Sequence, residues 1–175
     1  MNQIVSEPHP LSQDTRLIPL TQGQFALVDA ADYDWLMQWK WCAAWNPNTR
    51  SYYAKRNTPR VNGKQDSIWM ARSILGLDQN DSRIADHITH QTLDNRHVNL
   101  RVVTGSQSVM NRRLPRNNTS GFKGVVLDKR TGRWRAQIYF ERKRISLGFF
   151  SNPEHAHAIY QKAALRYFGQ YACMG

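Results

Sequence analysis

Residues 133–139 alternate between apolar and polar side chains, and this period of two restricts the fold more than any other feature of the chain. Neighbouring side chains of a strand point to opposite faces, so the apolar ones share a face: Trp134, Ala136 and Ile138. Two further segments alternate in the same way, residues 122–127 and residues 144–150. Short turns over 129–132 and 141–143 separate the three segments. The pattern predicts an antiparallel three-stranded sheet with one apolar face.

A helix signal follows the third segment. Asn152 is a favoured N-cap residue, Pro153 suits the first helical position, and Gly169 suits the position past the last turn. Between them, apolar residues recur at steps of three and four: Ala156, Ile159, Tyr160, Ala163 and Tyr167. This spacing predicts one helix that packs its apolar side on the apolar face of the sheet.

The formal net charge is +11, and the positive excess is concentrated in one block. Residues 1–100 hold 10 Lys and Arg against 10 Asp and Glu, whereas residues 101–150 hold 12 against 2. A concentrated basic block is typical of a polyanion-binding surface, since neutralising phosphates releases their counterions. The alternative is a basic face that contacts only solvent.

The polar face of the predicted sheet carries side chains suited to DNA. Arginine can bond to guanine edges or phosphates, and glutamine suits adenine. We expect double-stranded DNA as the partner of these residues: Lys123, Arg133, Arg135, Gln137, Tyr139, Arg144 and Ser146. Residues 112–120 lack apolar periodicity and are predicted to be a basic linker that follows the phosphate backbone through Arg112, Arg113 and Arg116.

The rest of the chain predicts smaller parts. We expect a flexible tail over 1–15, a mixed N-terminal module over 16–66, a second module over 67–111, and the sheet-and-helix domain over 121–172. Within the two modules, apolar runs and turn residues predict these elements: a hairpin over 17–28, a helix over 30–40, strands over 41–45 and 51–56, and a short helix over 68–75.

Two cysteines, Cys42 and Cys173, form no Cys-x-x-Cys pair, so neither a disulfide framework nor a zinc site is expected. No N-terminal apolar run resembles a signal peptide, and no segment approaches the roughly 20 apolar residues that span a membrane. We therefore expect a cytoplasmic protein without membrane association.

A resemblance to the HNH endonucleases of the phage and intron homing type is carried by residues 84–104, IADHITHQTLDNRHVNLRVVT. The N-terminal region of the phage enzymes is similar to RLIPLTQGQFALVDAADYDWL, and an AP2 DNA-binding domain is similar to NNTSGFKGVVLDKRTGRWRAQI. The resemblance implies an α+β fold in three parts: a small mixed N-terminal module, a ββα-metal (His-Me finger) hairpin and helix, and an AP2-type three-stranded antiparallel sheet packed on one helix.

The resemblance also implies a catalytic site. His87, which titrates near neutrality, is expected to activate water, with Asn99 orienting its ring. Asp86 and Ser108 match the metal-binding positions, although asparagine is usual where Ser108 stands. Oxygen ligands favour Mg²⁺, with Mn²⁺ as an alternative and no zinc expected.

Other polar residues of the same segment are expected to have lesser roles. Asn95 should brace the loop with Asp94 and Arg96, and His90 and His97 should lie in solvent. A histidine common in the family is replaced by Ala71, in the helix before the hairpin.

The sequence is compatible with three functions. The leading one is a metal-dependent, site-preferring HNH homing endonuclease that nicks DNA as a monomer in a bacterial or phage-infected cell. The second is a DNA-binding protein derived from such a nuclease with a damaged catalytic centre, which Ala71 and Ser108 favour. The third is a binder of single-stranded RNA or DNA that uses exposed aromatic residues.

Overall fold

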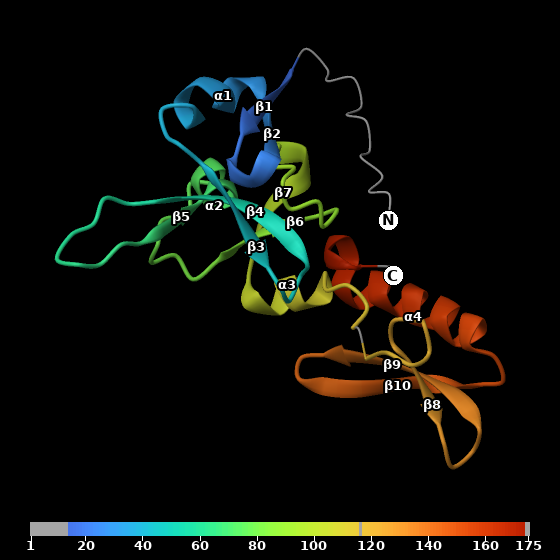
Figure 1. Ribbon diagram of the computed structural model, residues 1–175. Coiled ribbons are helices and arrows are strands. Elements are labelled where there is room, and N and C mark those ends of the chain that lie inside the picture. The colour runs from blue at the N-terminus through green and yellow to red at the C-terminus, as the bar shows by residue number, and fades with distance from the viewer. Residues whose placement is uncertain (1–13, 116, 174–175) are drawn as a thin grey trace, which may run out of the picture. The chain divides into compact units, whose positions relative to one another are not determined.

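The computed structural model describes residues 14–115 and 117–173 of the 175-residue chain (Figure 1). The chain divides into two compact units, Met1–Thr104 and Gly105–Gly175. Both combine helices with antiparallel sheets, which confirms the predicted α+β class. Residues 1–13 of the predicted tail lie outside the described residues, and Thr15 is already a buried residue of the first strand.

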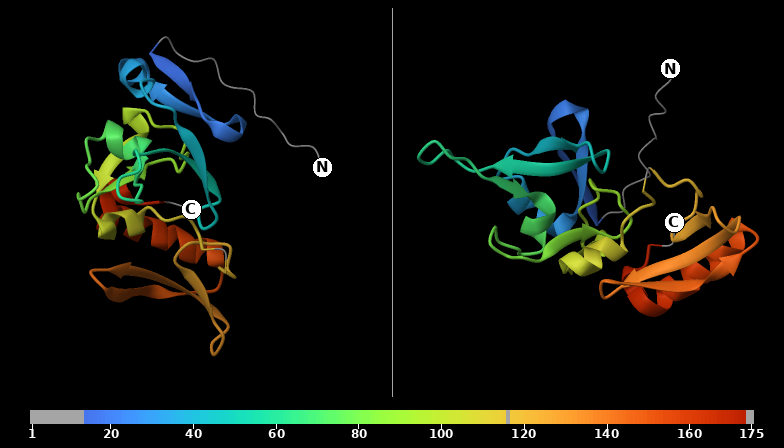
Figure 2. Two further views of the ribbon diagram at one scale, coloured as in Figure 1. Left: turned by 60° about the vertical axis from the view of Figure 1, so that its left-hand side comes forward. Right: turned by 90° about the horizontal axis from the view of Figure 1, so that it is seen from below.

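The first unit is built from short elements (Figure 2). Its strands are β1 (Thr15–Pro19), β2 (Phe25–Asp29), β3 (Cys42–Asn46), β4 (Ser51–Asn57), β5 (Ser67–Trp69), β6 (Ile84–His87) and β7 (Leu100–Val103). Its helices are α1 (Ala30–Leu36), α2 (Met70–Ile74) and the 3-10 turns η1 (Thr21–Gly23) and η2 (His97–Asn99). The strands form three antiparallel sheets: β1–β2, β3–β4–β5 and β6–β7.

The core of the first unit joins β1, β2, α1, β4 and α2. Its fully buried side chains belong to one cluster: Ile18, Ala26, Val28, Leu36, Trp41, Ala54 and Met70. The predicted hairpin over 17–28 is present as β1 and β2, with η1 at the turn. The strands predicted over 41–45 and 51–56 correspond to β3 and β4, which pair along the whole of β3.

Two predicted helices differ from the observed ones. The helix predicted over 30–40 ends at Leu36, because the indole nitrogen of Trp41 donates to the Leu36 carbonyl at 2.8 Å as the chain turns back. The helix predicted over 68–75 begins only at Met70, because Ile68 pairs with Arg56 and extends the sheet as β5. In both cases a tertiary contact overrides the local helical pattern.

The second unit contains the predicted sheet and helix. Its elements are α3 (Gly105–Met110), β8 (Val125–Asp128), β9 (Arg133–Phe140), β10 (Lys143–Phe150), α4 (Pro153–Phe168) and the 3-10 turn η3 (Gly169–Tyr171). The antiparallel sheet has the order β10–β9–β8, and α4 lies along one of its faces in both views (Figures 1 and 2). Met110, the last residue of α3, packs against the α4 core.

The caps of α4 agree with the sequence prediction. The Asn152 side-chain oxygen accepts a hydrogen bond from the His155 backbone N–H at 2.7 Å, and Gly169 ends the helix with a φ of 52°. One face of α4 packs on the apolar face of the sheet through its buried residues: Ala156, Tyr160, Ala164 and Phe168. Ile138, buried on β9, meets this face.

Gly124 lies directly under the Tyr160 ring, immediately before β8. Its φ is +74°, and an added Cβ would lie 2.0 Å from Tyr160 Cδ2. Its carbonyl accepts a hydrogen bond from the Gln137 backbone N–H at 2.8 Å, so the backbone here is also held by β9. Only glycine fits this place, because both the dihedral angle and the space exclude a side chain.

Candidate nucleic-acid interface

The predicted DNA-contacting side chains of β9 and β10 lie on the polar side of the β8–β9–β10 sheet. Ser146 pairs with Gln137 and Arg144 with Tyr139 in the register of β10 and β9, and these four residues share the face opposite α4. Tyr139 is 60% exposed, while Ala136 and Ile138, the apolar neighbours of Gln137 on β9, are buried. The strand alternation predicted from the sequence is confirmed.

Two side chains of this face carry polar atoms with no hydrogen-bond partner. Arg135 Nε and Gln137 Oε1 are both shielded from solvent and unpaired within the part of the chain that the structure describes. Unpaired polar atoms in such places cost free energy, and they call for an explanation. Because both atoms are shielded, a ligand that offers an acceptor to Arg135 and a donor to Gln137 could satisfy them only if the two side chains rotate outward.

Arg133 and Arg144 frame these two residues. Arg133 is exposed and donates from its guanidinium to the Phe149 carbonyl at 2.7 Å, which holds the side chain across to β10. Arg144 is exposed near the start of β10. The face therefore presents an ordered arginine beside the unpaired polar atoms of Arg135 and Gln137.

Lys123 does not lie on this face, contrary to the prediction. Its ammonium donates to three backbone carbonyls, those of Met110 at 3.2 Å, Arg112 at 2.6 Å and Cys173 at 3.3 Å. Lys123 precedes β8, so strand alternation does not govern its direction. Burial lowers the pKa of this ammonium, which acts as a link within the second unit.

The predicted linker arginines are only partly described. Arg112 and Arg113 are exposed, whereas Arg116 lies outside the described residues. Their contact with a phosphate backbone stays a prediction.

The β6–β7 hairpin pairs Asp86 with Arg101 instead of leaving its carboxylate open. These residues are register partners, and Asp86 Oδ2 accepts from Arg101 Nε and a terminal nitrogen, both at 2.9 Å. The two side chains are 12% and 14% exposed. A guanidinium already neutralises the carboxylate that was predicted to bind a divalent ion, so a bound metal would compete with it.

The partners of His87 also differ from the prediction. His87 Nε2 lies 3.2 Å from Asn95 Oδ1, and the His87 ring stands edge-on to Tyr53 at 6.0 Å between centroids. Asn99 braces the loop: its oxygen accepts from the backbone and hydroxyl of Thr89, and its nitrogen donates to the carbonyls of Gln91 and Asp94. The expected roles of Asn95 and Asn99 are therefore exchanged.

Burial lowers the pKa of His87 below its ordinary value of 6.5, although Asn95 and Asp86 oppose the shift. The folded state keeps the ring neutral, while the unfolded chain takes up a proton near pH 6.5. Since the unfolded state then binds more protons, stability is expected to fall as the pH drops below about 6.5, by at most about 1.4 kcal/mol per pH unit.

Denaturant unfolding at pH 7.5 and 5.5 checks this expectation. The acid-induced loss of stability should be smaller in His87→Gln than in the wild type. Equal pH dependence in the wild type and His87→Gln would contradict the burial argument.

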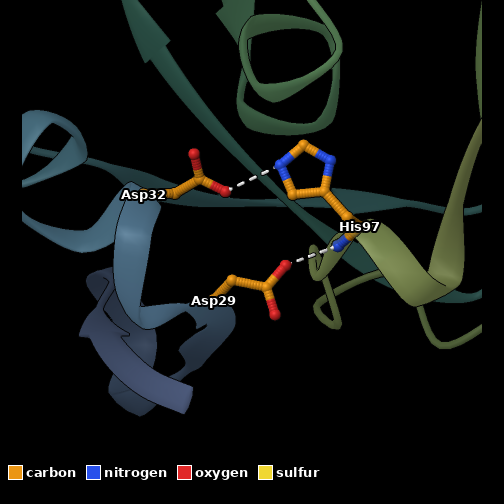
Figure 3. A group of neighbouring side chains, drawn as sticks. All are labelled: Asp29, Asp32 and His97. Carbon is orange, nitrogen blue, oxygen red and sulfur yellow. Dashed lines mark hydrogen bonds and ion pairs between the residues drawn. The ribbon is translucent and has the colours of Figure 1, made fainter. Parts of the chain in front are cut away.

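A second group of potential metal ligands joins the start of α1 to the connection between β6 and β7. Asp29, Asp32 and His97 each offer a ligand atom within 4.8 Å of the others (Figure 3). Asp29 Oδ2 accepts from the His97 backbone N–H at 2.7 Å, and Asp32 Oδ2 lies 3.0 Å from His97 Nε2. These contacts connect the start of α1 to η2. His97 is exposed, as expected, and it also contacts the two aspartates.

Ser108 lies on α3 in the second unit, whereas Asp86 belongs to the first. Their joint binding of a magnesium ion stays a prediction. Among the described residues, no helix is both long and apolar enough to cross a membrane.

Comparison with known proteins identifies relatives of an AP2 type. APETALA2-like protein 2 of Oryza sativa subsp. indica is 38% identical over 58 residues, which are 33% of this chain and 13% of that protein. AP2-like ethylene-responsive transcription factor TOE2 of Arabidopsis thaliana is 38% identical over 58 residues, 33% of this chain and 12% of that protein. An AP2/ERF and B3 domain-containing transcription factor of Arabidopsis thaliana is 44% identical over 50 residues, which are 29% of this chain and 14% of that protein.

The chain thus covers less than a fifth of the length of each of these relatives. No family model matches the chain, and no solved structure matches it. The resemblance to AP2 domains is confirmed by these relatives, and the sheet with its C-terminal helix agrees with it.

The predicted endonuclease activity is wrong. The named relatives are AP2 and AP2/ERF proteins, two of them called transcription factors, and no HNH enzyme is among them. The resemblance of residues 84–104 to an HNH hairpin finds no support from these relatives. The hairpin geometry agrees with this correction, because Asp86 is paired and Asn99 supports the loop.

Proposed function

We propose that this protein binds double-stranded DNA with a sequence preference, through the polar face of β8, β9 and β10. The observation that carries the proposal is that Arg135 and Gln137 lie on the face of β9 opposite α4, where each side chain also keeps one polar atom without a partner. They lie two residues apart on one face, and Arg144 and Ser146 extend that face on β10.

The charge distribution supports a polyanionic partner. Residues 101–150, which contain the whole sheet, hold 12 Lys and Arg against 2 Asp and Glu. Contacts of Lys and Arg with phosphates position a protein on DNA, and the resulting affinity falls steeply as salt is added. The relatives support the same partner, since those named transcription factors share the AP2 designation.

Sequence preference should come from the polar side chains at the centre of the face. A strand in the major groove can present arginine to the O6 and N7 atoms of guanine and glutamine to the N6 and N7 atoms of adenine. Arg135 and Gln137 offer these two groups side by side. Arg133 and Arg144 lie at the ends of the face and are expected to contact phosphates.

The test is selection of binding sites from a random duplex pool, followed by fluorescence anisotropy with the selected duplex. Arg135→Ala and Gln137→Ala should each lower the affinity for the selected sequence by roughly 5- to 150-fold, equivalent to about 1–3 kcal/mol, and relax the preference at one base pair. Arg144→Ala should weaken binding to all sequences alike and reduce the salt slope by about 0.9.

Arg166→Ala is the matched control, because Arg166 is an exposed arginine of α4, the helix that covers the other face of the sheet. It should bind the selected duplex nearly as the wild type does. The proposal fails if Arg135→Ala and Gln137→Ala bind as tightly as Arg166→Ala, or if the pool yields no preferred sequence.

A further inference from the structure

The first unit contains an open hollow that the sheet of the second unit does not explain. Its volume is about 480 Å³, and it is broadly open to solvent rather than enclosed. Three segments line it: residues 24–27 at the start of β2, the β3–β4 hairpin, and the loop 90–94. All three belong to the first unit, in which positive and negative residues nearly balance.

Aromatic side chains form one wall of the hollow. Phe25 is 54% exposed and Trp45 is 52% exposed, although both are large apolar residues next to a folded core. The Trp45 ring stands edge-on to Tyr52, with centroids 4.9 Å apart and an angle of 61° between the planes. Exposed rings held in a fixed orientation are the feature on which nucleic-acid bases stack in single-strand binding proteins.

The floor of the hollow is held by hydrogen bonds from two neighbouring strands. Leu27 of β2 donates its N–H to the Leu93 carbonyl at 2.8 Å and accepts from the Asn95 N–H at 2.7 Å. The Thr92 hydroxyl donates to the Tyr52 carbonyl of β4 at 2.5 Å. The loop is therefore fixed before any ligand binds, which reduces the entropy lost on binding.

The polar lining favours a base and its phosphate over a cationic or apolar partner. Gln24 and Gln91 supply amide donors and acceptors, and Arg50 is an exposed cation at the β3–β4 turn. The acidic lining residue, Asp94, is already neutralised by Arg96 at 2.6 Å. The hollow thus combines ring faces, amide groups and one positive charge, which are the groups that contact single strands.

We propose that this hollow binds one unstacked base of a single-stranded nucleic acid, with the base against Trp45 and its phosphate near Arg50. The site is separate from the duplex-binding face and does not depend on it. Arg50 adopts a left-handed φ of 52°, which costs free energy for a non-glycine residue and directs the turn at the rim.

The experiment measures binding of the full chain to labelled oligo(dT) and oligo(U), which distinguishes DNA from RNA as the source of the base. Trp45→Leu keeps apolar bulk but removes the ring face, and it should lower the affinity by roughly 5- to 150-fold, the value of one stacked base. Trp45→Phe should retain most of the binding. Trp39→Leu is the matched control, since Trp39 is a 38% exposed tryptophan of the same unit that does not line the hollow.

Measurements in the Arg135→Ala background separate this site from the duplex-binding face. The same loss on Trp45→Leu is expected there, whether or not the duplex proposal succeeds. A photo-crosslink from 5-iodouracil in the oligonucleotide should map to Phe25, Trp45 or Tyr52. Equal losses in Trp45→Leu and Trp39→Leu, no loss in either, or crosslinks confined to the second unit would each overturn the proposal and leave a peptide as the occupant to test.

Discussion

A Gly124→Ala variant is expected to lose about 2–5 kcal/mol of the free energy of unfolding of the second unit. An alanine at a φ of +74° costs roughly 1–2 kcal/mol, and its methyl group would lie 2.0 Å from Tyr160 Cδ2. Tyr160 is only 4% exposed and packs against Ile138 and Phe168, so its ring has no room to move. Forcing extra volume into such a core typically costs about 1–3 kcal/mol more.

Native-state hydrogen exchange of the β9 backbone amides in the full chain is a suitable measurement, because these amides report on the second unit alone. Gly132→Ala is the matched control, because Gly132 has a similar φ of +67° with nothing within 4 Å of an added Cβ. This control should show the backbone cost alone. Similar losses of unfolding free energy in the two variants would show that the Tyr160 ring does not exclude a side chain at position 124.

An Asn99→Ala variant is expected to destabilise the first unit by about 3–5 kcal/mol. The Asn99 side chain is 2% exposed and makes four hydrogen bonds, two accepted from Thr89 and two donated to the carbonyls of Gln91 and Asp94. Each lost bond costs about 0.5–1.5 kcal/mol, and buried groups left without a partner cost more. The loop 89–94 should lose its fixed conformation together with this stability.

Thermal unfolding measures the loss, and Asn80→Ala provides the control. Asn80 is exposed in a turn, so its substitution should change stability by no more than about 0.5 kcal/mol. A result for Asn99→Ala as small as that of Asn80→Ala would mean that Asn99 does not hold the loop. Asn99→Ala should also increase amide hydrogen exchange at Thr89 and Gln91, which tests the local effect directly.

The second unit could be predicted almost completely from the sequence, because its signals are local. Alternation along residues 133–139 determines which side of β9 meets α4, and Asn152 and Gly169 cap the helix through their own side chain and backbone. Neither signal depends on distant residues. The packing face of α4 follows from them, whereas the register of β10 against β9 shifts between Ser146 and Gly148, which alternation alone does not predict.

The candidate site was less predictable, because its contacts depend on tertiary structure. Lys123 turns towards the carbonyls of Met110 and Cys173, which are far from it in the sequence. Asn95 and Asn99 lie in one short loop, and only the folding of that loop decides which of them reaches His87. A residue type and its spacing do not carry this information.

The endonuclease interpretation had the same weakness. It depended on the order of acid, imidazole and amide groups along residues 86–99, and a pattern of this kind is weak without its three-dimensional context. The register of β6 and β7 places Arg101 opposite Asp86, and that pairing could not be read from the motif.

The three carbonyls that accept from the Lys123 ammonium come from both ends of the second unit. Met110 and Arg112 precede the sheet, and Cys173 follows α4, so entry and exit lie side by side. Units with adjacent ends tolerate insertion into unrelated hosts, because the host backbone need only open a narrow gap. The second unit is therefore suited to insertion as a domain into otherwise different proteins.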